Sequence, residues 1–180
     1  MFKIWESLEE LNSLSPLLNQ WFVGGFMHGK QSNELPNLLE AFKKLREIDP
    51  PTMNMTLYRV SPYERTVHNL VETELHLISS WSETEMHARQ FYGSVSMDRN
   101  SPVKNKSHAL FKSVFSPQEI LVVVNSLLPK LDAILTDAER QDNFPYRLGN
   151  LHHSMDWHKN QREVIVSAPG KRTVKIIDWL

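Results

Sequence analysis

The chain has 180 residues, of which 41% are hydrophobic and 23% charged, a composition typical of one globular domain that buries its own core. The absence of cysteine excludes disulfide bonds and cysteine-ligated zinc. A formal net charge of −1 gives no electrostatic reason to expect nucleic acid or an anionic membrane as a partner. We find no signal-peptide pattern and no apolar stretch of membrane-spanning length, so we expect a cytoplasmic protein.

The first fifty residues are predicted to be helical, because apolar residues recur there at helical spacing. Pro16 follows Ser15, a pair that favours the start of a second helix with Ser15 as its N-cap. A further helix is expected over residues 36–48, and the prolines at 50 and 51 end it. We expect residues 1–50 to form a helical part, and residues 51–180 to form the core of the same single domain.

Strand patterns begin after this helical part. β-branched, aromatic and apolar runs predict strands over residues 55–60, 75–79 and 120–124, the last as a buried central strand. Residues 163–166 and 173–177 flank Pro169 and Gly170, which predicts a hairpin. Helices followed by a mostly antiparallel sheet define an α+β fold.

One helix is predicted between these strands. Ser82 and Glu85 have the spacing of a capping box, and Ala88, Phe91 and Tyr92 then share one helical face. Residues 93–106 are polar and are expected to form a long loop. Residues 127–138 fit either a short helix or a turn-rich segment, and residues 141–160 are expected to be irregular.

Three short motifs fall on these elements in a fixed order. They are Tyr58-Arg59 on the first strand, Ser80-Trp81-Ser82 before the helix, and Gln161-Arg162-Glu163 at the start of a strand. Together they resemble the Arg…Ser-x-Ser…Gln-x-Glu series of the ADP-ribosyltransferase superfamily, in its Arg–Ser–Glu group of mono-ADP-ribosyltransferases. The resemblance covers residues 37–180. It implies N-terminal helices packed on a split antiparallel sheet, NAD as co-substrate without a metal, and transfer of ADP-ribose to a macromolecule with release of nicotinamide.

The resemblance assigns the NAD site to the first two motifs. Arg59, next to Tyr58, would hold the NAD phosphates, a task that suits the bidentate fork of arginine. Ser80 would orient the catalytic glutamate and the ribose through its hydroxyl. Ser82 and Phe91 complete the expected site. Trp81 replaces the threonine of the family pattern, a departure, and is expected to pack beside the dinucleotide.

The third motif supplies the expected catalytic carboxylate. Residues two apart on a strand share a face, so Gln161 and Glu163 are predicted to face one cleft. Glu163 would stabilise the cationic ribose that forms as nicotinamide leaves. In the families that this motif resembles, a glutamine at the position of Gln161 implies an acceptor other than arginine. Gln161 and Trp157 are expected to contact the acceptor, with Phe144 and Tyr146 as further aromatic candidates.

Other interpretations remain open at this stage. The same motifs suit an NAD glycohydrolase, and the fold alone suits a catalytically silent binding protein. A metal site at His152, His153, Asp156 and His158 is disfavoured because these residues lack helical ligand spacing on a predicted helix. Lys112 and residues 104–106 could contact the NAD phosphates, but we expect them to form a charged surface exposed to solvent. The expected acceptor is a protein, although nucleic acid and small molecules stay possible, and the setting fits an effector, a toxin or a phage-encoded modifier.

Overall fold

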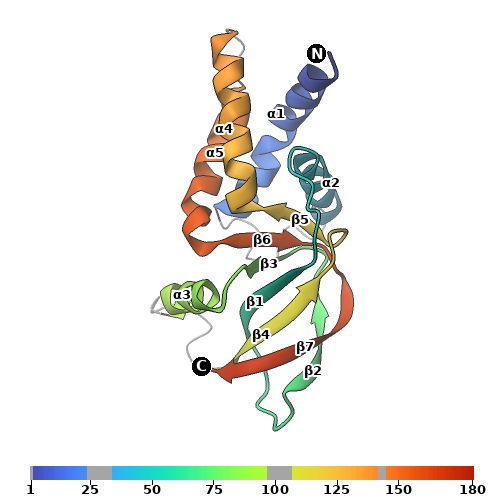
Figure 1. Ribbon diagram of the computed structural model, residues 1–180, viewed down its shortest axis with the longest axis vertical. Helices are drawn as coiled ribbons and strands as arrows, with labels where there is room; N and C mark the ends of the chain where they lie inside the picture. The colour runs from blue at the N-terminus through green and yellow to red at the C-terminus, as the bar shows by residue number, and fades with distance from the viewer. Residues whose placement is uncertain (1, 24–33, 97–106, 142–144) are drawn as a thin grey trace. The chain divides into compact units, whose positions relative to one another are not determined.

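The computed structural model describes residues 2–23, 34–96, 107–141 and 145–180, without the side chains of residues 2–7, 91 and 93–96. This part of the chain holds five α-helices and an open antiparallel sheet of seven strands, which confirms the predicted α+β class (Figure 1). It divides into a helical unit, residues 1–51 and 121–159, and a sheet unit, residues 52–120 and 160–180. No described helix is long and apolar enough to cross a membrane.

The helical unit begins with α1 (Phe2–Phe22), one continuous helix, so the predicted break at Pro16 is wrong. Ser15 does not cap a second helix. It is buried, and its Oγ donates to the carbonyl oxygen of Leu11 at 2.7 Å. Proline cannot donate to the carbonyl four residues before it, which here belongs to Asn12. The side chain of the same residue, Asn12, forms a separate hydrogen bond, in which its Oδ1 accepts from the backbone N–H of Leu148 at 3.1 Å.

The core of the helical unit is aromatic and aliphatic. The prediction for residues 36–48 is confirmed by α2 (Leu35–Arg46), which buries Leu38 and Phe42 completely. Phe42 meets the rings of Trp21 and Phe22 edge to face, with centroids 5.7 Å and 6.3 Å away. Such contacts add to the gain from burying apolar area. They join α1 firmly to α2.

Two helices lie in the segment that sequence patterns leave undecided or irregular. They are α4 (Val124–Arg140) and α5 (Tyr146–His158), so the prediction of irregular structure over residues 141–160 is wrong for residues 146–158, while residues 142–144 lie outside the described part. Leu148, Leu151 and Met155 are fully buried at a helical spacing. The signal was present, but the histidines and aromatics between these residues obscured it. The structure groups α4 and α5 with the N-terminal helices, whereas the sequence suggested one core over residues 51–180.

The strands lie in the order β2-β7-β4-β1-β3-β6-β5. Their bounds are β1 (Met55–Pro62), β2 (Leu70–Leu75), β3 (Ser79–Ser82), β4 (His108–Phe115), β5 (Ile120–Val123), β6 (Glu163–Val166) and β7 (Gly170–Trp179). β1 confirms the first predicted strand. β5 stands at the end of the order, so the prediction of a central strand is wrong. An apolar run reports burial, here of residues 120–122, and does not report position within a sheet.

Two further strand predictions are corrected. The strand expected over residues 75–79 is not formed, because Leu75 ends β2, Ser79 begins β3, and residues 76–78 connect the two. β6 and β7 do not form a hairpin: β6 pairs with β3, whereas β7 pairs with β2 and β4. Gly170, in the predicted Pro169-Gly170 turn, has a φ of 105° and is the first residue of β7, which is separated from β6 in the sheet by β4, β1 and β3.

The helix α3 (Glu85–Ser96) begins two residues later than predicted. Its first turn is held by Thr84, whose Oγ1 accepts from the backbone N–H of His87 at 3.3 Å. Ser82 is therefore the last residue of β3 and not the N-cap. The helix covers part of the predicted loop, because residues 93–96 are helical. Residues 97–106 lie outside the described part.

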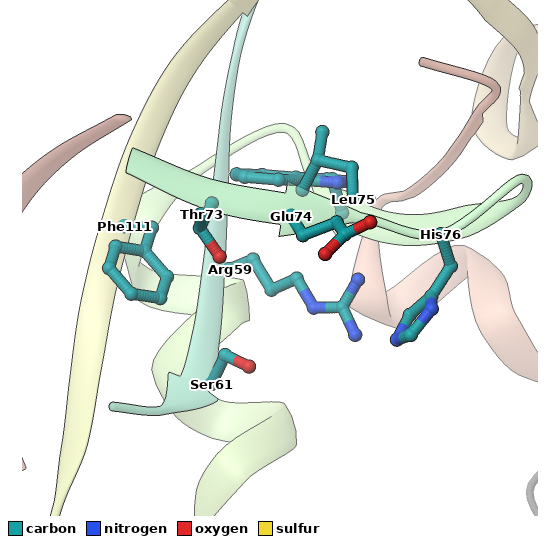
Figure 2. Close-up of a pocket in the computed structure, with 8 residues that line it drawn as sticks. Arg59, Ser61, Thr73, Glu74, Leu75, His76 and Phe111 are labelled. Carbon is teal, nitrogen blue, oxygen red and sulfur yellow. The ribbon is translucent and has the colours of Figure 1, made fainter. Parts of the chain in front are cut away.

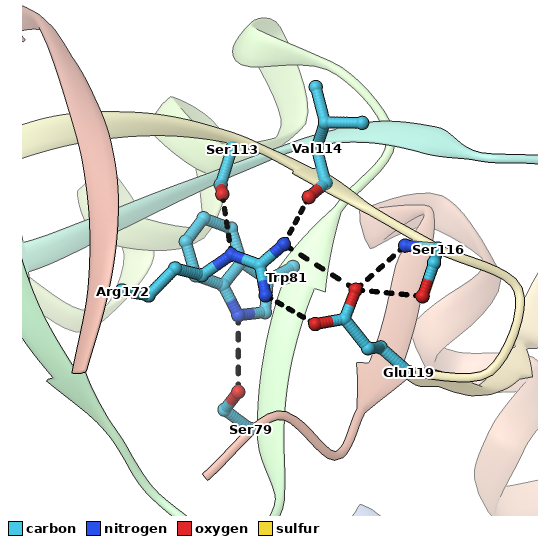
Figure 3. Close-up of polar contacts among 7 residues, drawn as sticks. All are labelled: Ser79, Trp81, Ser113, Val114, Ser116, Glu119 and Arg172. Carbon is cyan, nitrogen blue, oxygen red and sulfur yellow. Dashed lines mark hydrogen bonds and ion pairs between the residues drawn. The ribbon is translucent and has the colours of Figure 1, made fainter. Parts of the chain in front are cut away.

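A network around Arg172 ties the start of β7 to the turn between β4 and β5 (Figure 3). Arg172 Nε donates to Ser113 Oγ at 2.9 Å, and Nη1 pairs with Glu119 Oε1 at 2.5 Å. Its guanidinium lies 4.1 Å from the ring centre of Phe115. Glu119 also accepts from the backbone N–H of Ser116 at 2.8 Å. Burial raises the pKa of Glu119, but the hydrogen bonds from Arg172 and Ser116 outweigh it and hold that pKa below its ordinary value.

Candidate functional site

The three motifs lie on strands β1, β3 and β6, which are neighbours in the sheet. Tyr58 pairs with Ser82 across β1 and β3, and Ser82 pairs with Glu163 across β3 and β6. Residues paired in this way point to the same face of a sheet. Segments that are far apart in the sequence thus meet in one row of side chains.

Ser80 and Glu163 are joined directly. Ser80 Oγ donates to Glu163 Oε1 at 2.6 Å, the short length expected of a hydrogen bond to a carboxylate. Glu163 is only 5% exposed, so this carboxylate is withdrawn from bulk water. The predicted contact between the serine hydroxyl and the glutamate is therefore present.

The approach to Glu163 is irregular and differs from the prediction. Gln161 ends a short 3₁₀ helix, η2 (Lys159–Gln161), and β6 begins at Glu163. Between them, Arg162 has a φ of 46°, in the left-handed region. The backbone N–H of Glu83 donates to the Arg162 carbonyl at 3.0 Å, and Arg162 Nη1 lies 3.3 Å from Glu83 Oε2. The prediction that Gln161 is a strand residue is therefore wrong, and strand alternation does not place it on the face of Glu163.

Arg59 lines a cleft of its own (Figure 2). The cleft encloses about 360 Å³, including space open to solvent, and its walls come from β1, β2, β3 and β4. Its lining residues are Arg59, Ser61, Thr73, Glu74, Leu75, His76, Trp81 and Phe111. Figure 2 shows the guanidinium extending towards the opening between Glu74 and His76. Sequence reasoning missed the wall from β2, because residues 70–75 do not alternate between polar and apolar types; only their exposure in the folded strand alternates.

The guanidinium of Arg59 has no hydrogen-bond or ion-pair partner among the described residues. The side chain is half-buried, and burial lowers the pKa of Arg59 because it disfavours the charged form. An arginine nevertheless stays charged at neutral pH. Glu74 also lines the cleft but forms no ion pair with Arg59. A desolvated cation without an ion-pair partner is costly, so the guanidinium is suited to an anionic ligand.

The structure therefore forms two groups from the predicted residues. Ser80, Ser82 and Glu163 share one face of the sheet, while Arg59 and Trp81 line the cleft. Along β1, Arg59 follows Tyr58 and so points to the opposite face from the Tyr58–Ser82–Glu163 row. β1 and β3 are paired only at Tyr58 and Ser82, so the two strands part beside Arg59 and Trp81.

Trp81 is a core residue as well as a cleft residue. It is 2% exposed and meets the ring of Phe115 at 4.9 Å, inclined by 64°. Its indole N–H donates to Ser79 Oγ at 3.1 Å, as Figure 3 shows. Ser79 thus has a structural role that the motif did not reveal, since the pattern assigned roles to Ser80 and Ser82 alone.

The remaining predicted residues are placed as follows. Trp157 lies on α5 in the helical unit, is 73% exposed, and donates from Nε1 to His153 Nε2 at 3.4 Å. Phe91 lies in α3, but its side chain is outside the description, as is Phe144. The described residues contain no group of three or more histidine or acidic side chains arranged to hold a metal.

Comparison of the chain with protein-family models, with curated proteins and with solved structures gives no match in any of the three. A function must accordingly be argued from the residues and their geometry.

Proposed function

We propose that this protein is a mono-ADP-ribosyltransferase of ADP-ribosyltransferase-like fold that uses NAD as its co-substrate. The observation that carries the proposal is the hydrogen bond from Ser80 Oγ to Glu163 Oε1. It joins two of the three motifs and fixes a carboxylate that is 5% exposed. A carboxylate fixed in a water-poor site acts more strongly on a developing positive charge than one in solvent.

The chemistry follows from these groups. The bond between the ribose C1′ and the nicotinamide nitrogen breaks, and its electron pair leaves with nicotinamide. Glu163 stabilises the cationic ribose that remains and holds a ribose hydroxyl, while Ser80 keeps the carboxylate oriented. A nucleophile on the acceptor then donates its electron pair to C1′ and gives up its proton to solvent. No metal enters this sequence.

Arg59 is assigned to the NAD phosphates. Support comes from its position in a cleft where its guanidinium forms no ion pair among the described residues, next to the place where β1 and β3 part. Arg59 and Glu163 belong to opposite faces of the sheet, so the assignment of one NAD molecule to both residues rests on the resemblance of the motifs. Gln161 is assigned to the acceptor, which we expect to be a protein.

Incubation of the protein with NAD labelled in its adenylate half tests the proposal. Label attached to a macromolecule, lost in Glu163→Gln and kept in Glu64→Gln, supports transfer. Glu64 is a matched control because it is an exposed acid of the same unit. Free ADP-ribose without labelled macromolecule indicates an NAD glycohydrolase. Absence of both products, together with absence of NAD binding by calorimetry, would leave a binding protein of the same fold.

A further inference from the structure

The row of paired residues that contains Glu163 extends across six strands of the sheet. From β6 the register runs through Glu163, Ser82, Tyr58, Lys112, Lys175 and Leu70. Each pair is directly opposite across neighbouring strands, so all six side chains belong to one face. With strands about 4.8 Å apart, Lys112 lies three strands, or about 14 Å along the sheet, from Glu163.

Two lysines stand side by side in this row. Lys112 and Lys175 are directly opposite, a position in which like charges destabilise a sheet. Among the described residues neither lysine has a carboxylate partner; Lys112 Nζ lies 5.9 Å from the centre of the Tyr58 ring. Of the acids that alternation assigns to this face, Asp178 pairs with Arg89 at 2.7 Å, and neither Glu72 nor Glu74 forms an ion pair with either lysine among the described residues.

The surface around the lysines is a groove with apolar sides. It has a volume of about 790 Å³, including space open to solvent. Leu70 and Val114 line it and are 62% and 53% exposed. Arg172 also borders it, but its guanidinium is held by Glu119. Two uncompensated cations beside exposed apolar side chains suit a ligand with both phosphate and an apolar part, as in a nucleotide.

We propose that Lys112 and Lys175 form a phosphate-binding subsite on the face of the sheet that carries Glu163, distinct from the Arg59 cleft. The phosphate belongs either to the co-substrate itself or to a separate nucleotide-like ligand such as an acceptor. Binding of phosphate at this subsite does not depend on whether the protein transfers ADP-ribose.

The first test is calorimetric titration of the full chain with inorganic pyrophosphate. Arg59→Ala is the background, because it removes the other candidate cation. Lys112→Met/Lys175→Met in that background is expected to weaken pyrophosphate binding at least tenfold, since methionine keeps the apolar stem and removes the charge. Lys43→Met/Lys171→Met in the same background is the matched control, because it makes the same change in net charge at two exposed lysines. This control is expected to bind pyrophosphate with the affinity of the Arg59→Ala background.

A second variant protects the test against an effect on folding. Lys175→Glu places a negative charge opposite Lys112, so the variant should keep or raise the melting temperature of the protein. It should nevertheless lose binding of pyrophosphate, because one of the two cations is gone. Equal binding by the lysine variants and their control, or no binding by the Arg59→Ala background, would overturn the subsite.

The same variants in the native background, titrated with NAD, identify the source of the phosphate. If the lysine variants lose affinity for NAD by about the same factor as for pyrophosphate, the subsite belongs to the co-substrate. Unchanged NAD affinity with lost pyrophosphate binding assigns it to a separate phosphate-bearing ligand. If the wild-type chain releases no nicotinamide but binds pyrophosphate through the lysines, the proposed enzyme activity fails and the subsite stands.

Discussion

Ser80 and Glu163 are 83 positions apart in the chain, yet Ser80 Oγ lies 2.6 Å from Glu163 Oε1. The contact exists because β3 and β6 pair antiparallel, with Ser80 opposite Ile165 and Ser82 opposite Glu163. Ser80 thus lies two residues from the partner of Glu163, on the same face. A hydrogen bond from a fixed strand gives the carboxylate one defined orientation, a form of preorganisation that requires no movement during a reaction.

Glu163→Gln should nearly abolish transfer while NAD binding and the fold persist. The substitution keeps the shape of the side chain but removes the negative charge opposite the developing cation, which typically costs about 10²–10³ in rate. Turnover with labelled NAD and calorimetric binding, measured on one preparation, check this expectation. Retention of more than a tenth of the wild-type turnover would exclude Glu163 as the catalytic carboxylate.

Ser80→Ala should lower turnover more than it raises the Michaelis constant for NAD. A hydrogen bond to a charged group contributes about 1.5–3 kcal/mol, so we expect a loss of roughly tenfold to a hundredfold in rate. Ser79→Ala is the paired control on the same strand. It removes the partner of the Trp81 indole and should cost about 1–3 kcal/mol of stability, with turnover per folded molecule unchanged. Equal kinetic effects of the two variants would argue against an orienting role for Ser80.

Arg59→Met should weaken NAD binding and raise stability at the same time. The methionine removes a half-buried cation that has no partner in the described part of the chain, so we expect a gain of about 1 kcal/mol or more. NAD affinity should fall at least about tenfold, because a charged contact to phosphate is lost. Arg59→Lys should restore affinity only in part, since lysine lacks the bidentate fork. Urea unfolding and calorimetry measure the two effects, and an unchanged affinity in the Met variant would remove Arg59 from the site.

The Arg172–Glu119 pair should make stability sensitive to acid. The folded-state pKa of Glu119 lies below its ordinary value, so its contribution is present above the unfolded-state pKa of about 4.3. This contribution is lost as the pH falls through the folded-state pKa. Wild type should therefore lose more free energy of unfolding between pH 6 and pH 3 than Glu119→Gln does. Parallel curves for the two proteins, recorded by urea titration at each pH, would contradict the expectation.

Gln161→Ala should suppress modification of the acceptor and spare much of the slow hydrolysis of NAD. Transfer requires a second reactant held in line, an effect worth several kcal/mol, whereas cleavage of NAD depends on Glu163. The position of Gln161 on a 3₁₀ helix leaves this prediction without support from strand alternation. A parallel fall of both activities at unchanged melting temperature would assign Gln161 to cleavage itself.

The sequence was most informative where local patterns decide the structure. The amphipathic spacing of α2 and the β-rich run of β1 predicted those elements, and the Ser-x-Ser and Gln-x-Glu motifs predicted the contact between Ser80 and Glu163. The two elements are predicted from short-range periodicity, which a sequence displays directly, whereas the contact between Ser80 and Glu163 was implied by the resemblance of the motifs to the family pattern.

The pairing of strands could not be predicted in the same way. Gly170 marks a turn whether the chain then returns beside β6 or crosses to β4 and β2, and the structure has the second arrangement. The Arg59 cleft was missed for the same reason, because one of its walls is β2, which pairs with the distant β7. Pro16 was misleading because a long helix can carry a proline when tertiary contacts stabilise it.

The discontinuous course of the helical unit restricts how the protein can be divided. Phe42 and Leu18 belong to the same compact unit as Leu148 and Met155, which follow them by more than a hundred residues. A recombinant fragment that starts at residue 51 would keep α4 and α5 but strip away their apolar partners, and such a fragment is expected to aggregate. A shortened version of the protein that lacks residues 1–51 therefore also has to exchange residues 121–159 for a short linker, so that both halves of the helical core leave together.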